Sequence, residues 1–275
     1  MTTADWPGVP AAHELHLWRA PLDVDPSLLA RLAACLSLGE LERSARLRQD
    51  LDRTRFIAAR GWLRMLLARY LESAASGVKL TEGPHGKPRL ASGPGWLRFN
   101  LSHSDRIAVY AVARDREVGV DVERLRSVFP IAEVARHYYS PRELSDLATL
   151  PERNRSRAAF DCWTRKEAYL KALGVGLAEG LAEFDVMVRP GERVRMHDSW
   201  ADRAGGRQWS LDSFDAGPGY AAAVAVEGDG CSIPDAASPL APALLSQNPA
   251  LDVSSFEVDS AFIEDPACRH PCAVH

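Results

Sequence analysis

One segment, residues 160–174, constrains the fold of this chain more than any other, because a single predicted helix carries both an apolar stripe and charge. Its apolar face follows three-and-four spacing through Phe160, Trp163, Leu170 and Gly174. Glu167 falls in the middle of that face. A buried carboxylate must be paired, bound to a metal ion or neutralised by a shifted pKa. The alternative to a functional site is a purely structural ion pair between Glu167 and Lys171, which lies one helical turn further on.

The composition is that of an ordinary globular protein of 275 residues, with 46% hydrophobic and 25% charged residues. Its longest apolar runs, 107–113 and 220–226, are too short to span a bilayer. No basic and apolar export signal opens the chain, so we expect a cytoplasmic protein with no membrane partner. Five cysteines, an odd number, do not indicate a disulfide framework.

Charge is unevenly distributed along the chain, although the net charge is only −4. Residues 229–275 are acidic and rich in Pro, Ser and Ala, which predicts a flexible tail. Its Cys268, His270, Cys272 and His275 match no standard zinc-finger spacing. Arginines crowd the region 43–69, and their commonest role is a solvated face. Aromatic residues are not interleaved with them, so we do not expect a nucleic-acid partner.

Two carboxylates share one face of a predicted strand at 118–123. The valines of Val118-Gly-Val-Asp-Val-Glu123 point one way, while Asp121 and Glu123 point the other. Their Cα atoms should lie about 6.5–7 Å apart, close enough to coordinate one hard cation, and Gly119 leaves room beside them. A solvent-facing acidic strand is the alternative.

Two parts of the chain resemble each other. Trp62-Leu-Arg64 on a predicted helix at 52–72 parallels Trp163-Thr-Arg165 on the helix at 151–174, and each helix is followed by strands ending in a similar apolar run. We therefore expect an α/β (α+β) fold of two pseudo-twofold-related halves, each a long helix packed on a small, mostly antiparallel sheet, with the active-site cleft between them. The expected parts are a leader (1–13), two halves (14–115 and 116–228) and the tail (229–275). A shorter helix is expected at 28–36, and strands at 14–21, 97–101, 106–113, 118–123, 181–189, 194–197, 209–214 and 220–227.

Four motifs in register resemble the 4′-phosphopantetheinyl transferases, in their larger, pseudo-dimeric, surfactin-synthetase-activating class. They are His-Gly-Lys-Pro at 85–88, Phe-Asn-Leu-Ser-His-Ser at 99–104, Gly-Val-Asp-Val-Glu at 119–123 and Trp-Thr-Arg-Lys-Glu-Ala-Tyr-Leu-Lys-Ala at 163–172. Order and spacing agree over residues 14–227. The resemblance implies transfer of the phosphopantetheine arm of coenzyme A to a serine of an acyl or peptidyl carrier protein, with release of adenosine 3′,5′-bisphosphate, by a monomer.

The resemblance also implies roles for individual residues. Asp121, Glu123 and Glu167 would hold Mg²⁺, or Mn²⁺ in its place, and Asp121, Glu167 and Lys171 would be catalytic. Glu167 or a metal-bound water would take the serine proton. The implied contacts to coenzyme A phosphates are Arg43, Arg46, Arg55, Lys87, Ser102, His103 and Lys171. Lys166 points about 100° away from Glu167 on the helix, which favours a salt bridge.

Two other functions use some of the same features. A Mg²⁺-dependent hydrolase acting on coenzyme A or another nucleotide diphosphate would share the metal site. A non-catalytic module that binds carrier proteins would share the arginines, but it has no use for a buried carboxylate cluster.

Overall fold

The first half of the chain places a long helix on a four-stranded sheet. The computed structural model describes residues 6–126, 131–176, 181–186 and 207–245. The strand order of this sheet is β4-β5-β1-β9, and a two-stranded β2-β3 sheet lies beside it. The elements are β1 (Leu15–Pro21), α1 (Pro26–Ala33), α2 (Leu38–Ala45), α3 (Asp50–Tyr70), a 3-10 turn (Ala75–Gly77), β2 (Leu80–Glu82), β3 (Pro88–Leu90), β4 (Leu97–Ser104) and β5 (Ile107–Arg114).

The second half repeats this plan with a three-stranded antiparallel sheet of order β6-β8-β7 and a second long helix, α6. Gly174 ends α6 in the left-handed conformation, with φ of 75°, as glycine often does just after a helix. The elements are β6 (Val118–Arg124), α4 (Ile131–Tyr138), α5 (Pro141–Thr149), α6 (Glu152–Leu173), a 3-10 turn (Leu181–Glu183), β7 (Trp209–Ser213) and β8 (Tyr220–Glu227). Two further elements, β9 (Ser238–Pro239) and α7 (Leu240–Leu245), follow in the chain and pack on the first half.

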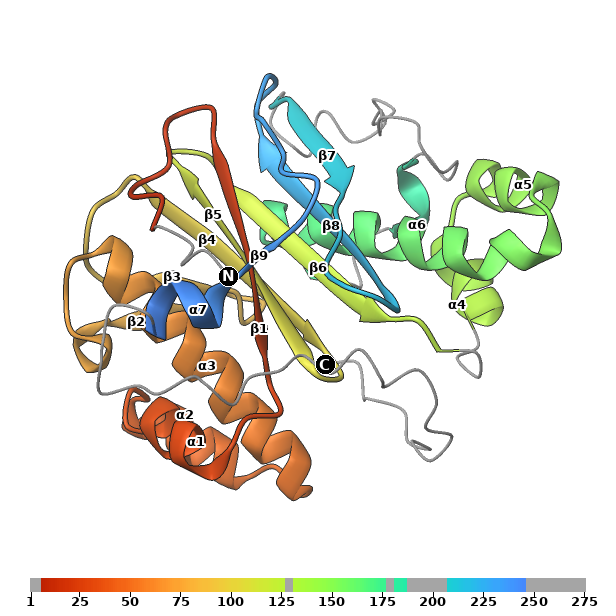
Figure 1. Ribbon diagram of the computed structural model, residues 1–275. Helices are drawn as coiled ribbons and strands as arrows, with labels where there is room; N and C mark the ends of the chain where they lie inside the picture. The colour runs from red at the N-terminus through yellow and green to blue at the C-terminus, as the bar shows by residue number, and fades with distance from the viewer. Residues whose placement is uncertain (1–5, 127–130, 177–180, 187–206, 246–275) are drawn as a thin grey trace.

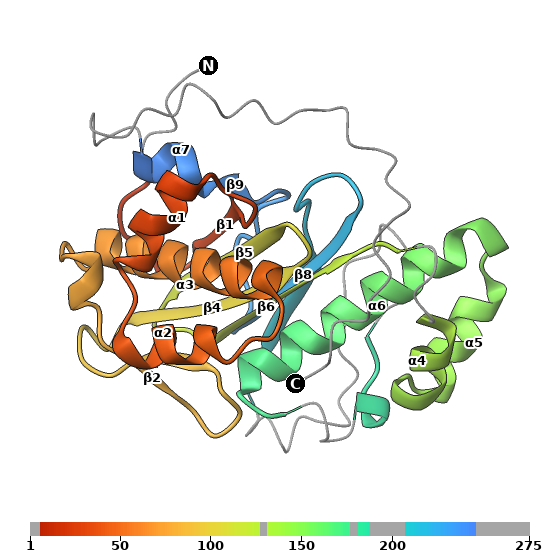
Figure 2. The same cartoon turned by 90° about the horizontal axis from the view of Figure 1, so that it is seen from below.

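The helices and sheets stack as α3, first sheet, second sheet and α6 (Figures 1 and 2). Strand alternation fills the spaces between these layers. In β5, Tyr110 and Val112 face α3, while Val109 and Ala111 face the second sheet. The expected mixed α+β fold is confirmed, because each long helix covers the outer face of its own small, mostly antiparallel sheet.

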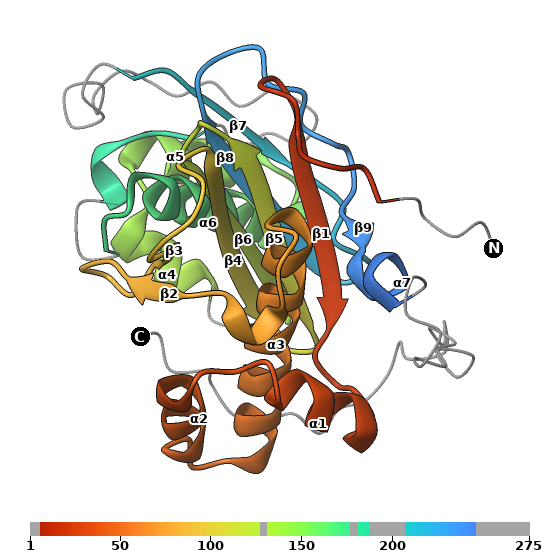
Figure 3. The same cartoon turned by 90° about the vertical axis from the view of Figure 1, so that its left-hand side faces the viewer.

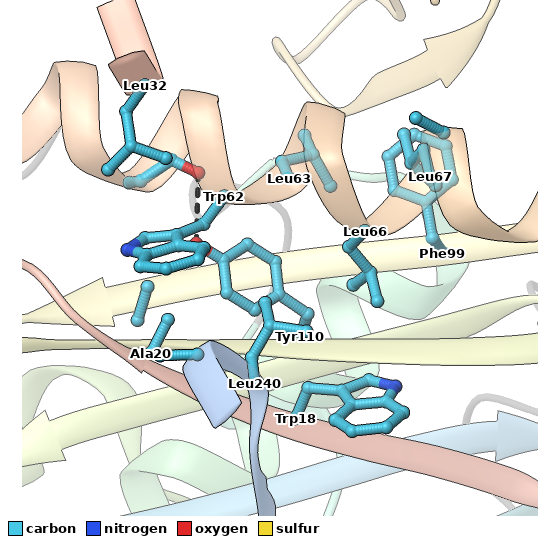
Figure 4. Packing of buried hydrophobic residues seen from close by; sticks show 14 of the residues in the cluster. Trp18, Ala20, Leu32, Trp62, Leu63, Leu66, Leu67, Phe99, Tyr110 and Leu240 are labelled. Carbon is cyan, nitrogen blue, oxygen red and sulfur yellow. Dashed lines mark hydrogen bonds between the residues drawn. The ribbon is translucent and has the colours of Figure 1, made fainter. Parts of the chain in front are cut away.

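The core of the first half is built on α3 (Figure 4). Trp62 is fully buried between α3 and the sheet, and its indole N–H donates to the Pro21 carbonyl at 3.0 Å. The Tyr110 hydroxyl reaches across from β5 and donates to the Ala59 carbonyl at 2.9 Å. These bonds satisfy the polar atoms of the two large side chains, Trp62 and Tyr110, where α3 packs on the sheet.

Most of the expected elements are present at nearly the expected positions. The prediction of a strand over 181–189 is wrong for its first part, because Leu181–Glu183 form a 3-10 turn. The predicted strand at 194–197 lies outside the described residues. Helices α2, α4 and α5 were not anticipated, because each is only eight or nine residues long and too short to show a long apolar stripe.

The prediction of a flexible tail is wrong for residues 231–245, which we call the C-terminal strap. The amide of Ser232 donates to the His13 carbonyl at 2.9 Å, and β9 pairs in parallel with β1 (Figure 3). Between those points, the amide of Ala237 donates to the Asp215 carbonyl at 2.9 Å in the second half. Leu240 in α7 is fully buried in the α3 core. The strap therefore contacts both halves, while residues 246–275, with their Cys and His residues, lie outside the described part.

Candidate active site

Strand β6 presents its carboxylates to α6. Val118, Val120 and Val122 are buried between the two sheets, so Asp121 and Glu123 are on the opposite face, as predicted. Gly119 lies on that face too, and a Cβ built on it would be 2.1 Å from the Ala168 carbonyl oxygen of α6. The strand and the helix approach this closely because Gly119 has no side chain.

Helix α6 brings Glu167 and Lys171 to these carboxylates. The Lys171 ammonium donates to Asp121 Oδ1 at 2.6 Å and to Ser102 Oγ at 3.0 Å. The partner of Lys171 in the described structure is thus Asp121, rather than the Glu167 that helical spacing offers. Although burial opposes its charge, the carboxylates of Asp121 and then Glu167 raise the pKa of Lys171.

Polar side chains of β4 join the first half to this site. The Ser102 hydroxyl donates to Asp121 Oδ1 at 2.9 Å, and the Ser104 hydroxyl donates to Glu123 Oε2 at 2.9 Å. Asn100 Oδ1 accepts from the Val120 amide at 2.8 Å. Asn100 and Ser104 were missed by sequence reasoning. The signal that could have found them is their period-two alternation with the predicted Ser102.

The pKa shifts of Glu167 and Glu123 show that the carboxylates lie close together in a buried site. Burial is the main cause that raises the pKa of Glu167 from 4.5 to about 8, followed by repulsion from the Asp121 carboxylate. The same two causes, in that order, raise the pKa of Glu123 to about 7. Glu167 also feels the charge of Glu123. Such mutual repulsion costs free energy unless a cation is added.

The donor set fits a hard divalent cation. No three His, Cys, Asp or Glu side chains in the described part of the chain are arranged as they stand to hold a metal ion. However, Asp121 Oδ2 and Glu167 Oε1 are buried atoms without a hydrogen-bond partner there. Carboxylate oxygens are the ligands that Mg²⁺ prefers, and it usually takes only one or two of them together with phosphate oxygens and water. These residues therefore fit Mg²⁺ as part of a shared protein–phosphate site.

Basic side chains of the first half, His103 and Arg60, lie near Lys171. His103 is an exposed residue of β4. Loss of solvent around its imidazole, followed by the positive charges of Lys171 and Arg60, lowers the pKa of His103. Arg60, on α3, was not singled out from the sequence because it was one of many arginines. Its side chain is 10% exposed and lies 3.3 Å from Glu82.

The other predicted arginines are placed less centrally. Arg55 pairs with Asp23 at 2.8 Å and with Asp105 at 3.1 Å, and its charge reaches His103. Arg43 pairs with Glu82 at 2.8 Å and lies over the Phe56 ring beside Arg60. Arg46 forms the C-cap of α2, and its side chain is exposed.

Lys87 does not join this group of cations. Its ammonium donates to Val118 O at 3.0 Å, to Ala172 O at 3.3 Å and to Glu117 Oε2 at 3.3 Å. The side chain is 9% exposed. This placement differs from the phosphate contact that the family resemblance implies for Lys87.

Lys166 is fully buried on the far side of α6. It pairs with Glu143 at 2.9 Å and donates to the carbonyls of Leu181 and Phe184 at 2.5 and 2.6 Å. Glu143 also accepts from the Val186 amide at 2.7 Å. Lys166 therefore ties α5 and the segment after α6 to the helix, as the predicted salt bridge requires.

Comparison with known proteins gives a consistent assignment. Residues 117–225 match the model of the 4′-phosphopantetheinyl transferase superfamily. The 4′-phosphopantetheinyl transferase HetI of Nostoc sp. is 40% identical over 219 residues, covering 79% of this chain and 89% of that protein. The 4′-phosphopantetheinyl transferase Sfp of Bacillus subtilis is 25% identical over 197 residues, covering 70% of this chain and 83% of that protein.

Similarity to solved structures is lower. The holo-[acyl-carrier-protein] synthase of Neisseria meningitidis is 19% identical in sequence, with a TM-score of 0.32. The match covers 41% of this chain and 98% of that protein. Within the described segments, every helix is too short or too polar to cross a lipid bilayer. The match to HetI over most of both chains carries the assignment: this chain is an enzyme of the 4′-phosphopantetheinyl transferase superfamily.

Proposed function

We propose that the enzyme transfers the 4′-phosphopantetheine arm of coenzyme A to a serine hydroxyl of an acyl or peptidyl carrier protein, with Mg²⁺ and with release of adenosine 3′,5′-bisphosphate. The observation that carries this proposal is that Asp121, Glu123 and Glu167 lie together beside the Lys171 ammonium, and that two of their buried oxygens, Asp121 Oδ2 and Glu167 Oε1, have no hydrogen-bond partner in the described structure. A diphosphate that shares a divalent cation with carboxylates and lies against basic side chains fits this arrangement.

Asp121, Glu123 and Glu167 would hold the metal ion. When bound, Mg²⁺ would offset the charge that builds on the diphosphate as its bond breaks. Ser102 and Ser104 fix the first two carboxylates through hydrogen bonds of 2.9 Å, so β4 keeps the acidic side of the site in place before substrate arrives.

Glu167 is the proposed general base. Its carboxylate would accept the proton of the carrier serine as that oxygen attacks the phosphorus attached to the pantetheine arm. The new P–O bond forms as the bond to the other phosphate breaks, and adenosine 3′,5′-bisphosphate leaves with the electron pair. A pKa of about 8 in the cation-free protein falls when positive charge is added, so Glu167 would be ionised in the loaded enzyme.

Lys171, His103 and Arg60 are the proposed contacts to the phosphates of coenzyme A, with Ser102 beside them. Arg60 and Arg43 are already paired with Glu82, and Arg55 is paired with Asp23, so each of these arginines would need to exchange partners to bind phosphate. The exposed Arg46 suits the acidic helix that carrier proteins present. Because residues of both 14–115 and 116–228 line the site, one chain would suffice for activity.

The test is incubation of the protein with coenzyme A and Mg²⁺, with and without a carrier protein, followed by mass spectrometry of the carrier. We expect the phosphopantetheine mass on the carrier serine, and adenosine 3′,5′-bisphosphate only when carrier is present. Release of that nucleotide at the same rate without carrier would indicate a hydrolase and contradict the proposal.

A further inference from the structure

We propose that Lys87 is a positioning residue that locks the end of α6 to the start of β6, and that it is not a phosphate ligand. This inference rests on the proposed function for its catalytic readout, but its structural basis is independent of it. Lys87 comes from the turn between β2 and β3 in the first half, yet two of its three acceptors are backbone carbonyls of the second half, Val118 O and Ala172 O.

The ammonium has no donor left for a ligand. A lysine ammonium has three N–H donors, and Lys87 has three acceptors within 3.3 Å. Burial lowers the pKa of Lys87, while the charge of Glu117 acts in the opposite direction. Moving the ammonium to a phosphate would leave a buried carbonyl and a carboxylate without this partner, which costs free energy.

The acceptor on α6, Ala172 O, is a carbonyl at the end of the helix, where backbone carbonyls lack an intrahelical partner. Ala172 O is among the last four carbonyls of α6, which have no partner within the helix. A positive charge at that end is also favoured by the helix dipole. Lys87 therefore acts as a cap supplied from the other half of the molecule.

The same turn has further contacts beyond the end of α6. A Cβ on Gly176 would lie 2.9 Å from His85 Nδ1, and one on Gly174 would lie 3.3 Å from Arg89 Nη2. His85 of the turn and Arg89 of β3 therefore lie against residues 174–176, on either side of Lys87 in the sequence.

The hydrogen bonds of Lys87 to Val118 O and Ala172 O lie next to the residues of the candidate active site. Ala172 follows Lys171, whose ammonium binds Asp121, and Val118 begins the strand that carries Asp121 and Glu123. A Cβ on Gly119 would lie 2.3 Å from the Ala172 amide nitrogen, so strand and helix are in contact at this point. By joining the two carbonyls, Lys87 fixes the helix against the strand and so fixes Lys171 against Asp121.

The experiment compares Lys87→Met with Lys79→Met, an exposed lysine of the same half. Three quantities are measured: kcat for transfer, the Kd for coenzyme A without divalent cation, and hydrogen exchange of the amides at 170–175. For Lys87→Met we expect faster exchange at 170–175, a kcat lowered roughly tenfold to a hundredfold, and a Kd that rises by a smaller factor than kcat falls, because Lys171 keeps its charge. Lys79→Met should match the wild type in all three.

A phosphate ligand would give the reverse pattern. Loss of a charge-assisted contact would raise the Kd for coenzyme A about tenfold or more while exchange at 170–175 stayed normal, and that result would overturn the proposal. Wild-type exchange together with wild-type kcat would also overturn it. If Lys87→Met does not fold, Lys87→Arg, which keeps charge and several donors, replaces it with smaller changes expected in the same direction. Exchange and Kd need no turnover, so failure of the transfer assay in the wild type would count against the proposed function alone.

Discussion

Gly119 and Ala168 lie so close that the carbonyl oxygen of Ala168 occupies the place of a side chain on Gly119, at 2.1 Å from an ideal Cβ. This contact sets the spacing between β6, which carries Asp121 and Glu123, and α6, which carries Glu167. The clash is with backbone, so it cannot be relieved by turning a side chain.

Gly119→Ala should therefore separate the helix from the strand. We expect a loss of about 1–3 kcal/mol in the free energy of unfolding and a fall in kcat of roughly a hundredfold, because the carboxylates and Glu167 move apart. The measurements are urea unfolding and carrier modification at saturating coenzyme A.

Gly61→Ala is the matched control for that variant. A Cβ on Gly61 would lie 2.5 Å from Leu32 Cβ, which is a clash of the same kind between α3 and α1. Helix α1 carries no site residue and can yield, so stability should fall by about the same 1–3 kcal/mol while kcat stays near the wild-type value. Equal losses of kcat in the two variants would contradict the positional role of Gly119.

Glu167→Gln keeps the shape of the side chain but removes its charge. We expect transfer to slow by about 10²–10⁴-fold, the range that general-base groups contribute, while the fold and the affinity for carrier protein persist. The assay is single-turnover modification of a carrier. Asp161→Asn is the control, because Asp161 is also a carboxylate of α6 but pairs with Arg157 at 2.9 Å outside the site. Near-normal turnover of Glu167→Gln would exclude the proposed role.

Local periodicity explains which parts of this architecture the sequence predicts. The alternation in β6 correctly separates Val118, Val120 and Val122 from the carboxylates, because strand geometry alone decides which face each residue occupies. The apolar stripe around Glu167 likewise identifies α6 and its buried face.

Contacts between distant parts of the chain were not predictable in this way. Lys87 and Ala172 are 85 residues apart, and no periodicity links a turn lysine to a helix-end carbonyl. The C-terminal strap was misjudged for a related reason. Its composition is Pro- and Ser-rich, so the positions of Ala237 and Leu240, which complete cores made by other elements, carry no local signal.

Leu240→Ala should show that the C-terminal strap is part of the folded core. Leu240 is fully buried against α3, so truncating it should lower the free energy of unfolding by about 2–5 kcal/mol. Leu38→Ala is the control, because that side chain is 79% exposed and should change stability very little. Urea unfolding of the full chain measures both, and equal stability of the two variants would show that the strap is not packed as described.

Without divalent cations, the free energy of unfolding should fall as the pH rises from about 4.5 to about 8, because of the carboxylates of the site. Glu167 has a pKa of about 8 in the folded protein against 4.5 for its usual value, so between these pH values the folded state holds more protons than the unfolded chain. A raised acid pKa contributes stability that is present below about pH 4.5 and is lost as the pH approaches about 8. Glu123, with a pKa of about 7, acts in the same direction.

Glu167→Gln isolates this effect, since glutamine does not titrate. In EDTA, the urea midpoint of the wild type should therefore drop relative to that of Glu167→Gln between about pH 4.5 and 8. Mg²⁺ with coenzyme A should reduce the drop, because added positive charge stabilises the ionised carboxylates. A difference between the two proteins that stays constant with pH would mean that Glu167 ionises as freely in the fold as in the unfolded chain, and that the three carboxylates do not share one site.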